Sequence, residues 1–510
     1  MNFIVLVDDL SGRTMKMKNI LFLILTVFFV FSCKNNTEYK DYQVSFIESD
    51  TTTHKIPKGQ EFTFGYLTVP ENRSNPAGNT ISLPVYIFKS RSENPKPDPI
   101  LYTVGGPGNS SMSASQYMNY YKYLDDRDFI LFEQRGTQYA RPNLDCPEWS
   151  KAIQMSNLPN FNKSQSDSLF NAAARQCKKR LENKGIDLNG YNTNEIAADI
   201  EDLRKVLNIE QYNLLTISYS TKIAQVLIRD YPKTIRSAVM DSPLPLEVNY
   251  DEVSIKNLLD AVDKLLNDCA QDSECNKAFP NLKIRFHEYL MDRTENPLIV
   301  SVDNPKNRNE ETFYLTGKDL VTIFTSASTG GLPFVPLEIN KLLNDDLSSI
   351  KEQLASLFEE PGKGNGQGMR LSVWCAEEFP FASQTKIEEE TDKYPELKGL
   401  SPTVFKSEVC HIWNVKEAAD KENKPVNSNI PVLFISGEYD NETPPYFAKM
   451  MTENFTNSHH MIFKGWSHTP TTNWGNPCAM ESANEFFNNP TNKPLPDCFS
   501  KFTMPKFKVE

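Results

Sequence analysis

Signatures of metal and nucleic-acid binding are scarce in this sequence. The chain has only six histidines and no Cys-x-x-Cys pair, so the ligand spacing of common zinc sites is missing. No basic stripe is visible, and the formal net charge of −12 with a pI near 5.3 opposes contact with phosphates. Internal repeats and long low-complexity tracts are also missing. We therefore expect no metal, no cofactor and no nucleic-acid partner, which leaves small molecules or peptides as substrates.

The N-terminal segment has the pattern of an export signal. Lys16 and Lys18 precede an apolar run from Ile20 to Phe31, which is too short to span a bilayer comfortably. The run leads into Ser32-Cys33 and resembles a bacterial lipobox, so Cys33 would become the lipidated first residue of the mature chain. Ordinary cleavage without a lipid is the alternative. We expect an exported protein that a lipid anchors to a bacterial membrane.

The remaining cysteines suit a disulfide framework. Removing Cys33 from the nine cysteines leaves eight, an even number in a chain that leaves the reducing cytoplasm. Sequence alone permits many pairings, but these cysteines fall into neighbours along the chain. The expected disulfides are Cys146–Cys177, Cys269–Cys275, Cys375–Cys410 and Cys478–Cys498.

The chain of 510 residues is long enough for a catalytic domain and one substantial further domain. Residues 61–90 alternate apolar and polar side chains, which predicts antiparallel strands at the edge of a sheet. Short apolar runs follow, and these suit strands buried on both faces. The runs are 100–104, 129–132, 214–217 and 432–435.

Helical patterns alternate with these runs. Ile196, Ile200, Leu203 and Leu207 place one apolar stripe along a helix. The alternation predicts an α/β fold with a mostly parallel sheet flanked by helices. A largely helical stretch interrupts this alternation of strands and helices, which predicts an inserted, mainly helical cap domain. The expected segments are the signal (1–33), a tether and N-terminal segment (34–60), the first part of the catalytic domain (61–244), the cap (245–415) and the second part of the catalytic domain (416–510).

Ser218 is the candidate nucleophile. Residues 212–228 predict a buried strand, a tight turn at Ser218 and then a helix. A nucleophile elbow holds its serine on such a turn, so that the N–H of the next residue, Tyr219, can face a developing oxyanion. The usual flanking glycines are replaced by Thr216 and Ser220, although the turn favours small residues. An ordinary surface serine is the alternative.

Asp440 and His468 each follow a short apolar strand. Asp440 comes just after the buried run that begins at Ile430, and His468 lies 28 residues further on by subtraction of the residue numbers. The order Ser, Asp, His is that of α/β-hydrolases, so we expect Asp440 to orient His468 and His468 to act as the base. The rival bases and acids are His459, His460, Glu438 and Glu442.

A glycine-rich loop follows another buried strand, at Gly105-Gly-Pro-Gly108. Glycines there let the backbone pass close to a bound carbonyl and offer an N–H to the oxyanion. Gly106 and Tyr219 are therefore the expected oxyanion donors. A simple turn between two elements is the alternative.

Together these residues resemble the proline iminopeptidase and tripeptidyl aminopeptidase family of α/β-hydrolases. The resemblance covers the mature chain from about residue 60 to the C-terminus. Val104 stands where that family often has a histidine before the glycines. The matching segments are Gly105–Gly108, Phe132–Thr137, Ala238–Pro243, Pro431–Pro445 and Gly465–His468.

The resemblance implies an enzyme that removes residues from the free N-terminus of peptides. Acidic groups of the cap would then hold the α-ammonium of the substrate, and the segment 371–380 resembles the corresponding part of the larger secreted members. Glu377 and Glu378 are the candidates, and solvated cap residues are the alternative. Arg135 is expected to tie neighbouring loops rather than to act in catalysis.

Two other functions stay open at the level of sequence. A carboxylic-ester hydrolase would use the same three residues, because the cap alone decides the substrate. The altered turn around Ser218 also fits a catalytically inactive lipoprotein that binds peptides. The sequence predicts neither the oligomeric state nor a preference for proline.

Overall fold

The fold is taken from a computed structural model of the chain. It describes residues 43–156, 163–305, 308–325, 328–358, 366–400, 405–501 and 506–510. Residues 43–510 form one compact unit. The expected export signal and Cys33 lie outside the described residues. No helix among the residues described is long and apolar enough to cross a membrane.

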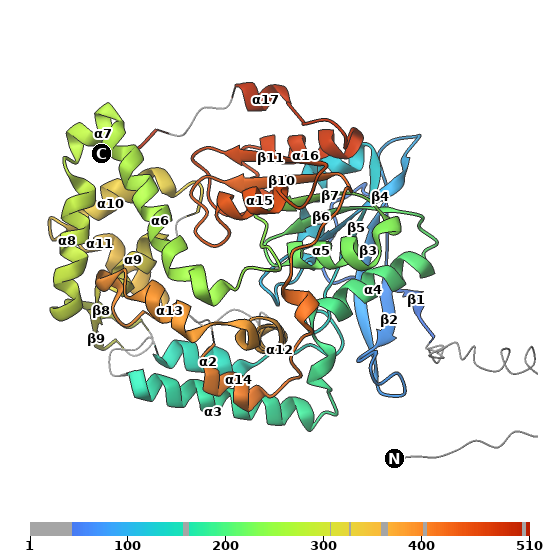
Figure 1. The fold of residues 1–510 in the computed structure, drawn as a ribbon, viewed down its shortest axis with the longest axis horizontal. Coiled ribbons are helices and arrows are strands. Elements are labelled where there is room, and N and C mark those ends of the chain that lie inside the picture. The colour runs from blue at the N-terminus through green and yellow to red at the C-terminus, as the bar shows by residue number, and fades with distance from the viewer. Residues whose placement is uncertain are drawn as a thin grey trace, which may run out of the picture. The chain divides into compact units, whose positions relative to one another are not determined.

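Nine strands of the described chain form the main sheet. Their bounds are β1 Ser45–Glu48, β2 Phe62–Pro70, β3 Thr80–Phe88, β4 Lys96–Thr103, β5 Arg127–Phe132, β6 Tyr212–Ile217, β7 Ile235–Asp241, β10 Val432–Gly437 and β11 Ser458–Phe463. They lie in the order β1-β2-β3-β5-β4-β6-β7-β10-β11 (Figure 1). Strands β1, β2, β3 and β5 pair antiparallel in turn, and β5, β4, β6, β7, β10 and β11 pair in parallel, which confirms the predicted antiparallel edge on a mostly parallel sheet.

Helices cover both faces of this sheet. Successive residues of a strand point to opposite sides, so each buried strand contributes side chains to two cores. Leu214 and Phe434 belong to one core, and their neighbours Leu215 and Leu433 belong to the other. The first face packs against α4 (Thr193–Val206), α5 (Ser220–Asp230) and α15 (Pro445–Thr452), and the same core continues into α2 (Pro147–Ser156) and α3 (Lys163–Glu182). The second face packs against the 3₁₀ helices η1 (Met112–Tyr120) and η2 (Lys122–Asp125) and against α16 (Cys478–Asn488).

The chain between β7 and β10 is mainly helical. Its helices are α6 (Tyr250–Gln271), α7 (Ser273–Ala278), α8 (Leu282–Glu295), α9 (Gly317–Thr325), α10 (Val335–Leu342), α11 (Ser348–Ser356), α12 (Gln367–Glu377), α13 (Gln384–Thr391) and α14 (Ser407–Trp413). A two-stranded antiparallel sheet of β8 (Leu298–Asp303) and β9 (Glu310–Leu315) also occurs there, which the helical pattern did not predict.

This insertion contributes to two separate cores. Helices α6 to α11 pack around their own apolar cluster, which includes Phe286, Leu290 and Ile339. Helices α12 and α14 instead share the core of α2 and α3, and Figure 1 shows these four helices together. The hairpin of α2 and α3 therefore lies in the first part of the catalytic segment but packs against the inserted part.

The described cysteines form four disulfides, which join the neighbours expected from the sequence. Cys375–Cys410 links α12 to α14, and Cys146–Cys177 links the loop before α2 to α3. The other two are Cys269–Cys275, between α6 and α7, and Cys478–Cys498, between α16 and α17 (Asp497–Ser500).

Candidate active site

Ser218 lies in the turn between β6 and α5, at the carboxyl end of a buried parallel strand. Its φ angle is 58°, in the left-handed region that non-glycine residues rarely adopt. The Ser218 N–H donates to the carbonyl of Asp241 at the end of β7, at 2.9 Å. A left-handed turn between a strand and a helix is the geometry that aims a serine side chain away from the sheet.

The two residues that replace the usual glycines each form a side-chain hydrogen bond. Ser220 is buried, and its hydroxyl accepts a hydrogen bond from the Ile217 N–H at 2.8 Å. The Thr216 hydroxyl lies against the next strand instead of the turn. The close approach falls on Gly105, where an added Cβ would lie 2.8 Å from both the Ile217 carbonyl and the Tyr219 nitrogen. The glycine that this turn requires is therefore on the loop after β4.

Asp440 and His468 follow β10 and β11, which are neighbouring parallel strands. Asp440 Oδ2 lies 2.7 Å from His468 Nδ1. The same carboxylate accepts hydrogen bonds from the N–H groups of Glu442 and Thr443, both at 2.9 Å, and from the Thr443 hydroxyl at 2.8 Å. Because Asp440 occupies Nδ1, the other ring nitrogen, Nε2, is the one available for proton transfer.

The environment of this pair favours the charged form of both groups. Burial alone would lower the pKa of His468, but Asp440, Glu442 and Asp241 raise it to about 9. Burial would likewise raise the pKa of Asp440, yet His468 and the Thr443 hydrogen bonds keep it below its usual value. Asp440 is therefore ionised at neutral pH, and His468 becomes a neutral base only under alkaline conditions.

The rival bases lie away from this arrangement. His459 and His460 are within β11 itself, and His460 Nε2 contacts the Ser436 hydroxyl at 3.0 Å. Burial lowers the pKa of His460 to about 4. Neither histidine lies beyond the carboxyl end of the strand, where His468 lies.

The rival acids have other contacts. Glu438 accepts a hydrogen bond from the Gly465 N–H and pairs with Lys264 at 3.0 Å. Glu442 is more than half exposed, and its carboxylate lies 3.7 Å from His468 Nε2. Glu442 therefore faces the proton-transfer nitrogen of His468, whereas Asp440 holds the opposite side of the ring.

Ser218 and His468 border neighbouring cavities. The Ser218 cavity has a volume of about 50 Å³ and the His468 cavity about 530 Å³, and Glu442 lines both. The Ser218 cavity is lined by Gly106, Pro107, Ser218, Tyr219, Leu244, Tyr250, Arg370, Val373, Trp374, Glu378, Glu442 and Thr443. The second cavity includes Thr329, Ser467, His468 and Trp474.

Both expected oxyanion donors reach the Ser218 cavity. The Tyr219 nitrogen stands at the N-terminal end of α5, where the first N–H groups of a helix have no intrahelical partner. Gly106 lies in the loop after β4 with a φ of 121°, which suits glycine. The buried carboxylate of Glu133 accepts hydrogen bonds from the Ser110 hydroxyl and the Ser111 N–H, both at 2.9 Å, and so holds this loop.

The two candidate acids of the insertion have different surroundings. Glu377 is not among the lining residues of the Ser218 cavity, because its carboxylate accepts hydrogen bonds from the backbone and hydroxyl of Thr193. Burial raises the pKa of Glu377 to about 7. Glu378 lines the cavity, pairs with Lys222 and accepts a hydrogen bond from the Tyr250 N–H at 3.0 Å.

Two neighbours of the site were not singled out from the sequence. Thr443 follows Asp440 by three residues, the spacing at which an Asp side chain commonly receives hydrogen bonds from the backbone of a turn. Arg370 directly precedes the segment 371–380, and the helical period places it on the same side of α12 as Trp374. The spacing from Asp440 could have predicted the role of Thr443 from the sequence. The place of Arg370 at the cavity could not be predicted in this way, because elements distant in sequence form that cavity.

Arg135 has the connecting role expected of it. Its guanidinium is buried and donates to Asp199 through Nε at 2.7 Å and through a terminal nitrogen at 2.6 Å. It also donates to the backbone carbonyls of Glu71 and Gly190. Arg135 thus joins the end of β2, the loop before α4 and α4 itself.

Comparison with known proteins identifies related chains along most of the sequence. Serine protease Hip1 of Mycobacterium tuberculosis is 23% identical over 445 residues, which cover 81% of this chain and 82% of Hip1. Putative hydrolase YuaR of Escherichia coli is 22% identical over 456 residues, covering 84% and 86% of the two chains. Tripeptidyl aminopeptidase of Streptomyces coelicolor is 22% identical over 443 residues, covering 83% and 80%.

Two family models match different parts of the chain. Residues 98–297 match the family described as alpha/beta hydrolase fold, and residues 399–497 match the TAP-like protein family. The first match includes β4, β6 and β7, and the second includes β10 and β11 with the loops that carry Asp440 and His468. Because these matches include the parallel strands of the sheet and the loops that carry Asp440 and His468, the chain belongs to the α/β-hydrolases, in their TAP-like family.

Proposed function

We propose that this protein is an exported serine aminopeptidase that releases residues or short peptides from free N-termini. The observation that carries the proposal is the 2.7 Å contact between Asp440 and His468, at the sheet edge where Ser218 occupies a left-handed turn. A buried acid, an oriented imidazole and a serine on such a turn are the parts of acyl transfer. The names of Hip1 and of the tripeptidyl aminopeptidase support peptides as substrates.

In the first half of the reaction, Ser218 Oγ attacks the scissile carbonyl carbon while His468 Nε2 takes the hydroxyl proton. The carbonyl oxygen becomes an oxyanion, and the N–H groups of Gly106 and Tyr219 donate to it. Asp440 stabilises the imidazolium. The tetrahedral intermediate then breaks its C–N bond, and His468 gives its proton to the departing amine, which leaves the N-terminal segment as an ester on Ser218.

In the second half, water attacks the ester carbon and passes one proton to His468. Collapse of the second tetrahedral intermediate breaks the bond to Ser218 Oγ, which recovers the proton from His468. The released acid is the N-terminal segment of the substrate. No metal or cofactor is needed for either half.

We assign recognition of the substrate α-ammonium to Glu378. Its carboxylate lines the cavity of Ser218 and is buried, so its attraction for a cation is screened less than at the surface. Lys222 and the Tyr250 N–H use part of its accepting capacity, but two carboxylate oxygens offer about four lone-pair sites in all. Glu377 lies behind it and positions Thr193.

We further propose that the chain is exported and that a lipid on Cys33 anchors it. The disulfides support an oxidising compartment, because such bonds persist outside the reducing cytoplasm. Fractionation of cells that make the full chain tests the anchor. We expect the protein in the membrane fraction and the Cys33→Ala variant outside it; equal partition of both would contradict lipidation.

An active-site-directed fluorophosphonate tests the chemistry. We expect it to label the purified protein but not Ser218→Ala. Ser348→Ala is the matched control, because Ser348 is an exposed serine at the start of α11 and should label like the parent protein. Failure of the folded parent protein to label would favour the alternative of an inactive peptide-binding lipoprotein.

Matched peptides then test the substrate class. We expect cleavage of peptides with a free N-terminus, and a loss of at least about 10-fold in kcat/KM on N-acetylation or in Glu378→Gln, because one charged hydrogen bond disappears. Turnover of simple esters without cleavage of free-amine peptides would instead establish a carboxylic-ester hydrolase.

A further inference from the structure

Arg370 on α12 is a partly buried cation that forms no salt bridge among the described residues. Its Nε atom is buried and makes no hydrogen bond, and its guanidinium lies 5.7 Å from the ring centre of Trp374. Burial lowers the pKa of Arg370, and the nearby Tyr250, Glu442 and Asp251 offset only part of this effect. Arg135 differs: burial would lower its pKa too, but Asp199 raises it above the usual value. An unpaired charge held away from water is costly unless a ligand compensates it.

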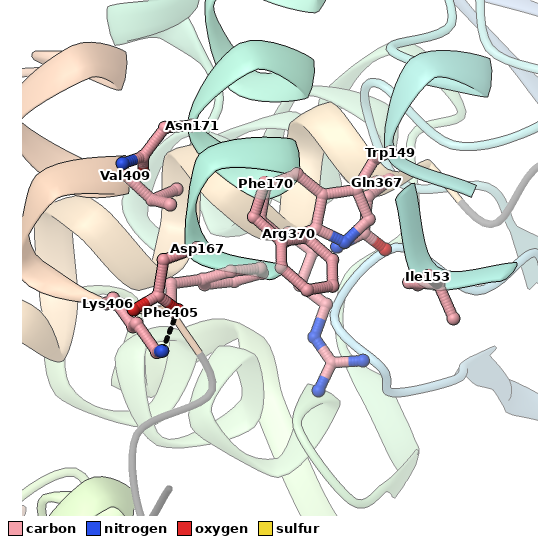
Figure 2. Close-up of a pocket in the computed structure, with 10 residues that line it drawn as sticks. All are labelled: Trp149, Ile153, Asp167, Phe170, Asn171, Gln367, Arg370, Phe405, Lys406 and Val409. Carbon is pink, nitrogen blue, oxygen red and sulfur yellow. Dashed lines mark hydrogen bonds and ion pairs between the residues drawn. The ribbon is translucent and has the colours of Figure 1, made fainter. Parts of the chain in front are cut away.

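Arg370 lies between two cavities. It lines the Ser218 cavity described above and also a second, more apolar cavity of about 320 Å³. The second cavity is lined by Trp149, Ile153, Asp167, Phe170, Asn171, Gln367, Arg370, Phe405, Lys406 and Val409 (Figure 2). A guanidinium shared by the two cavities can contact a ligand that extends from Ser218 into the second one.

The other charged residues of the second cavity satisfy each other. Asp167 and Lys406 form an ion pair, drawn as a dashed line in Figure 2, and no such line joins Arg370 to the residues drawn there. Trp149 packs against Phe170 and Phe405, with ring centres 4.9 and 5.3 Å apart. The cavity therefore offers aromatic walls and one positive charge that no salt bridge among the described residues holds.

The position of His468 indicates which part of a bound peptide would lie next to Arg370. His468 gives its proton to the departing amine, so the leaving peptide must lie beside its ring. His468 lines the cavity of about 530 Å³, and Arg370 lines the cavity of Ser218 and the oxyanion donors. The N-terminal segment that becomes the acyl group is therefore the part that extends towards Arg370.

We propose that Arg370 binds a carboxylate in the N-terminal segment of the substrate, so that the enzyme prefers peptides with Asp or Glu in that segment. The aromatic walls beside Arg370 accept the methylene groups of such a side chain or an apolar neighbour. Glu378 and Glu442 line the same Ser218 cavity, so a segment with both an ammonium and a carboxylate matches its charges. This inference rests on the proposed peptidase function and adds its substrate preference.

Peptides that differ in one side chain test the preference kinetically. A set with a common fluorogenic leaving group carries Glu, Gln or Lys in turn at each residue before the scissile bond. We expect kcat/KM for Glu to exceed that for Gln by about 10- to 100-fold at one position, as for a hydrogen bond to a charged group. Arg370→Gln should abolish this ratio, whatever its effect on the cleavage of Gln peptides, and Arg370→Lys should keep part of it.

Arg285→Gln is the control, because Arg285 lies on α8 and lines neither of the cavities that Arg370 borders; it should keep the full ratio. The reversal Arg370→Glu should shift the preference to Lys peptides. A parent enzyme that cleaves Glu and Gln peptides equally at every position would overturn the inference but leave the aminopeptidase function intact. A preference for Glu that survives in Arg370→Gln would also overturn it.

Equilibrium binding separates this inference from a failure of the peptidase function. Calorimetry with Ser218→Ala, which cannot turn over, measures the Kd of unlabelled tripeptides that contain Glu or Gln. We expect the Glu tripeptide to bind about 10-fold or more tightly in Ser218→Ala and no more tightly than the Gln tripeptide in Ser218→Ala/Arg370→Gln. Equal Kd values in Ser218→Ala contradict a carboxylate site at Arg370, whether or not the parent enzyme cleaves peptides.

Discussion

At the scale of single residues, the turn at Ser218 requires a residue without a side chain at the place where neighbouring backbone passes closest to it. Glycines on both sides of the serine would leave room for nearby chain, but here Ser220 fills that space and hydrogen-bonds to the Ile217 N–H. The room is provided by Gly105 on the loop after β4, where a Cβ would meet the Tyr219 nitrogen at 2.8 Å. The same requirement for space is met by a residue far away in sequence.

The charge on His468 sets the expected pH dependence. Proton transfer from Ser218 needs a neutral imidazole, and the pKa of His468 is raised to about 9. We therefore expect kcat/KM to rise about 10-fold per pH unit on the acid side and to level off near pH 9. Glu442→Gln should move this midpoint to lower pH, because it removes a carboxylate 3.7 Å from Nε2. Measuring kcat/KM from pH 5 to about pH 10 for both proteins checks this.

Glu453→Gln is the matched control, since Glu453 is an exposed carboxylate just after α15 and should leave the midpoint unchanged. The same shift affects stability: protonated His468 stabilises the fold fully below its ordinary pKa of 6.5, and this contribution is lost as the pH rises through about 9. A midpoint that stays at the same pH in Glu442→Gln would contradict the assigned influence of Glu442.

At the scale of elements, α12 carries much of the wall of the Ser218 cavity. Arg370, Val373 and Trp374 come from this helix, and Glu378 follows its last residue. The disulfide Cys375–Cys410 ties α12 to α14, which packs against α3. The position of the cavity wall therefore depends on a covalent link between two inserted helices.

Removal of that link should affect both stability and substrate binding. Replacing Cys375 and Cys410 by alanine opens a 35-residue separation, and we expect a loss of about 3–4 kcal/mol in the free energy of unfolding. We also expect a higher KM, because α12 loses its tie to α14. Urea unfolding and steady-state kinetics measure the two effects.

The disulfide Cys478–Cys498 provides the comparison. It spans 20 residues, so its loss should cost a similar free energy of unfolding, but it joins α16 to α17, and neither of its cysteines lines the Ser218 cavity. We expect no change in KM for this double variant. An equal rise in KM for both variants would mean that α12 is not specifically held by its own disulfide.

At the scale of the whole molecule, the antiparallel edge and the parallel part of the sheet are joined by a buried charge network. Arg135 and Arg73 both donate to Asp199, which is fully buried on α4. Arg135 also donates to carbonyls at the end of β2 and before α4. Loss of one member leaves another charge buried without its partner.

We expect Arg135→Met to lower the free energy of unfolding by about 3–5 kcal/mol, because Asp199 loses a buried partner. Arg175→Met should cost less than about 1 kcal/mol, since Arg175 is exposed and its contact with Glu408 is 3.9 Å long. Thermal and urea unfolding measure the difference. Fluorophosphonate labelling of the folded Arg135→Met protein should continue, whereas loss of labelling with an unchanged stability would give Arg135 a role in the active site.

Several features of the fold could be predicted from local patterns alone. Alternation over residues 61–90 marked β2 and β3, and the stripe through Ile196 and Leu203 marked α4. These predictions succeed because the side-chain period of a strand or helix is set by its backbone geometry and is visible in a short window. The hairpin β8–β9 was missed because it lies in a stretch whose pattern is mainly helical.

The order of strand-end residues was likewise sufficient to nominate Ser218, Asp440 and His468, since parallel strands bring their carboxyl ends to one edge of the sheet. The surroundings of the site were not accessible in that way. Gly105 against the turn, Glu377 turned towards Thr193, and Arg370 between two cavities each depend on elements that are distant in sequence. Packing between distant helices and strands has no local signal, so only the folded chain established which of these groups face the cavity and which are buried behind it.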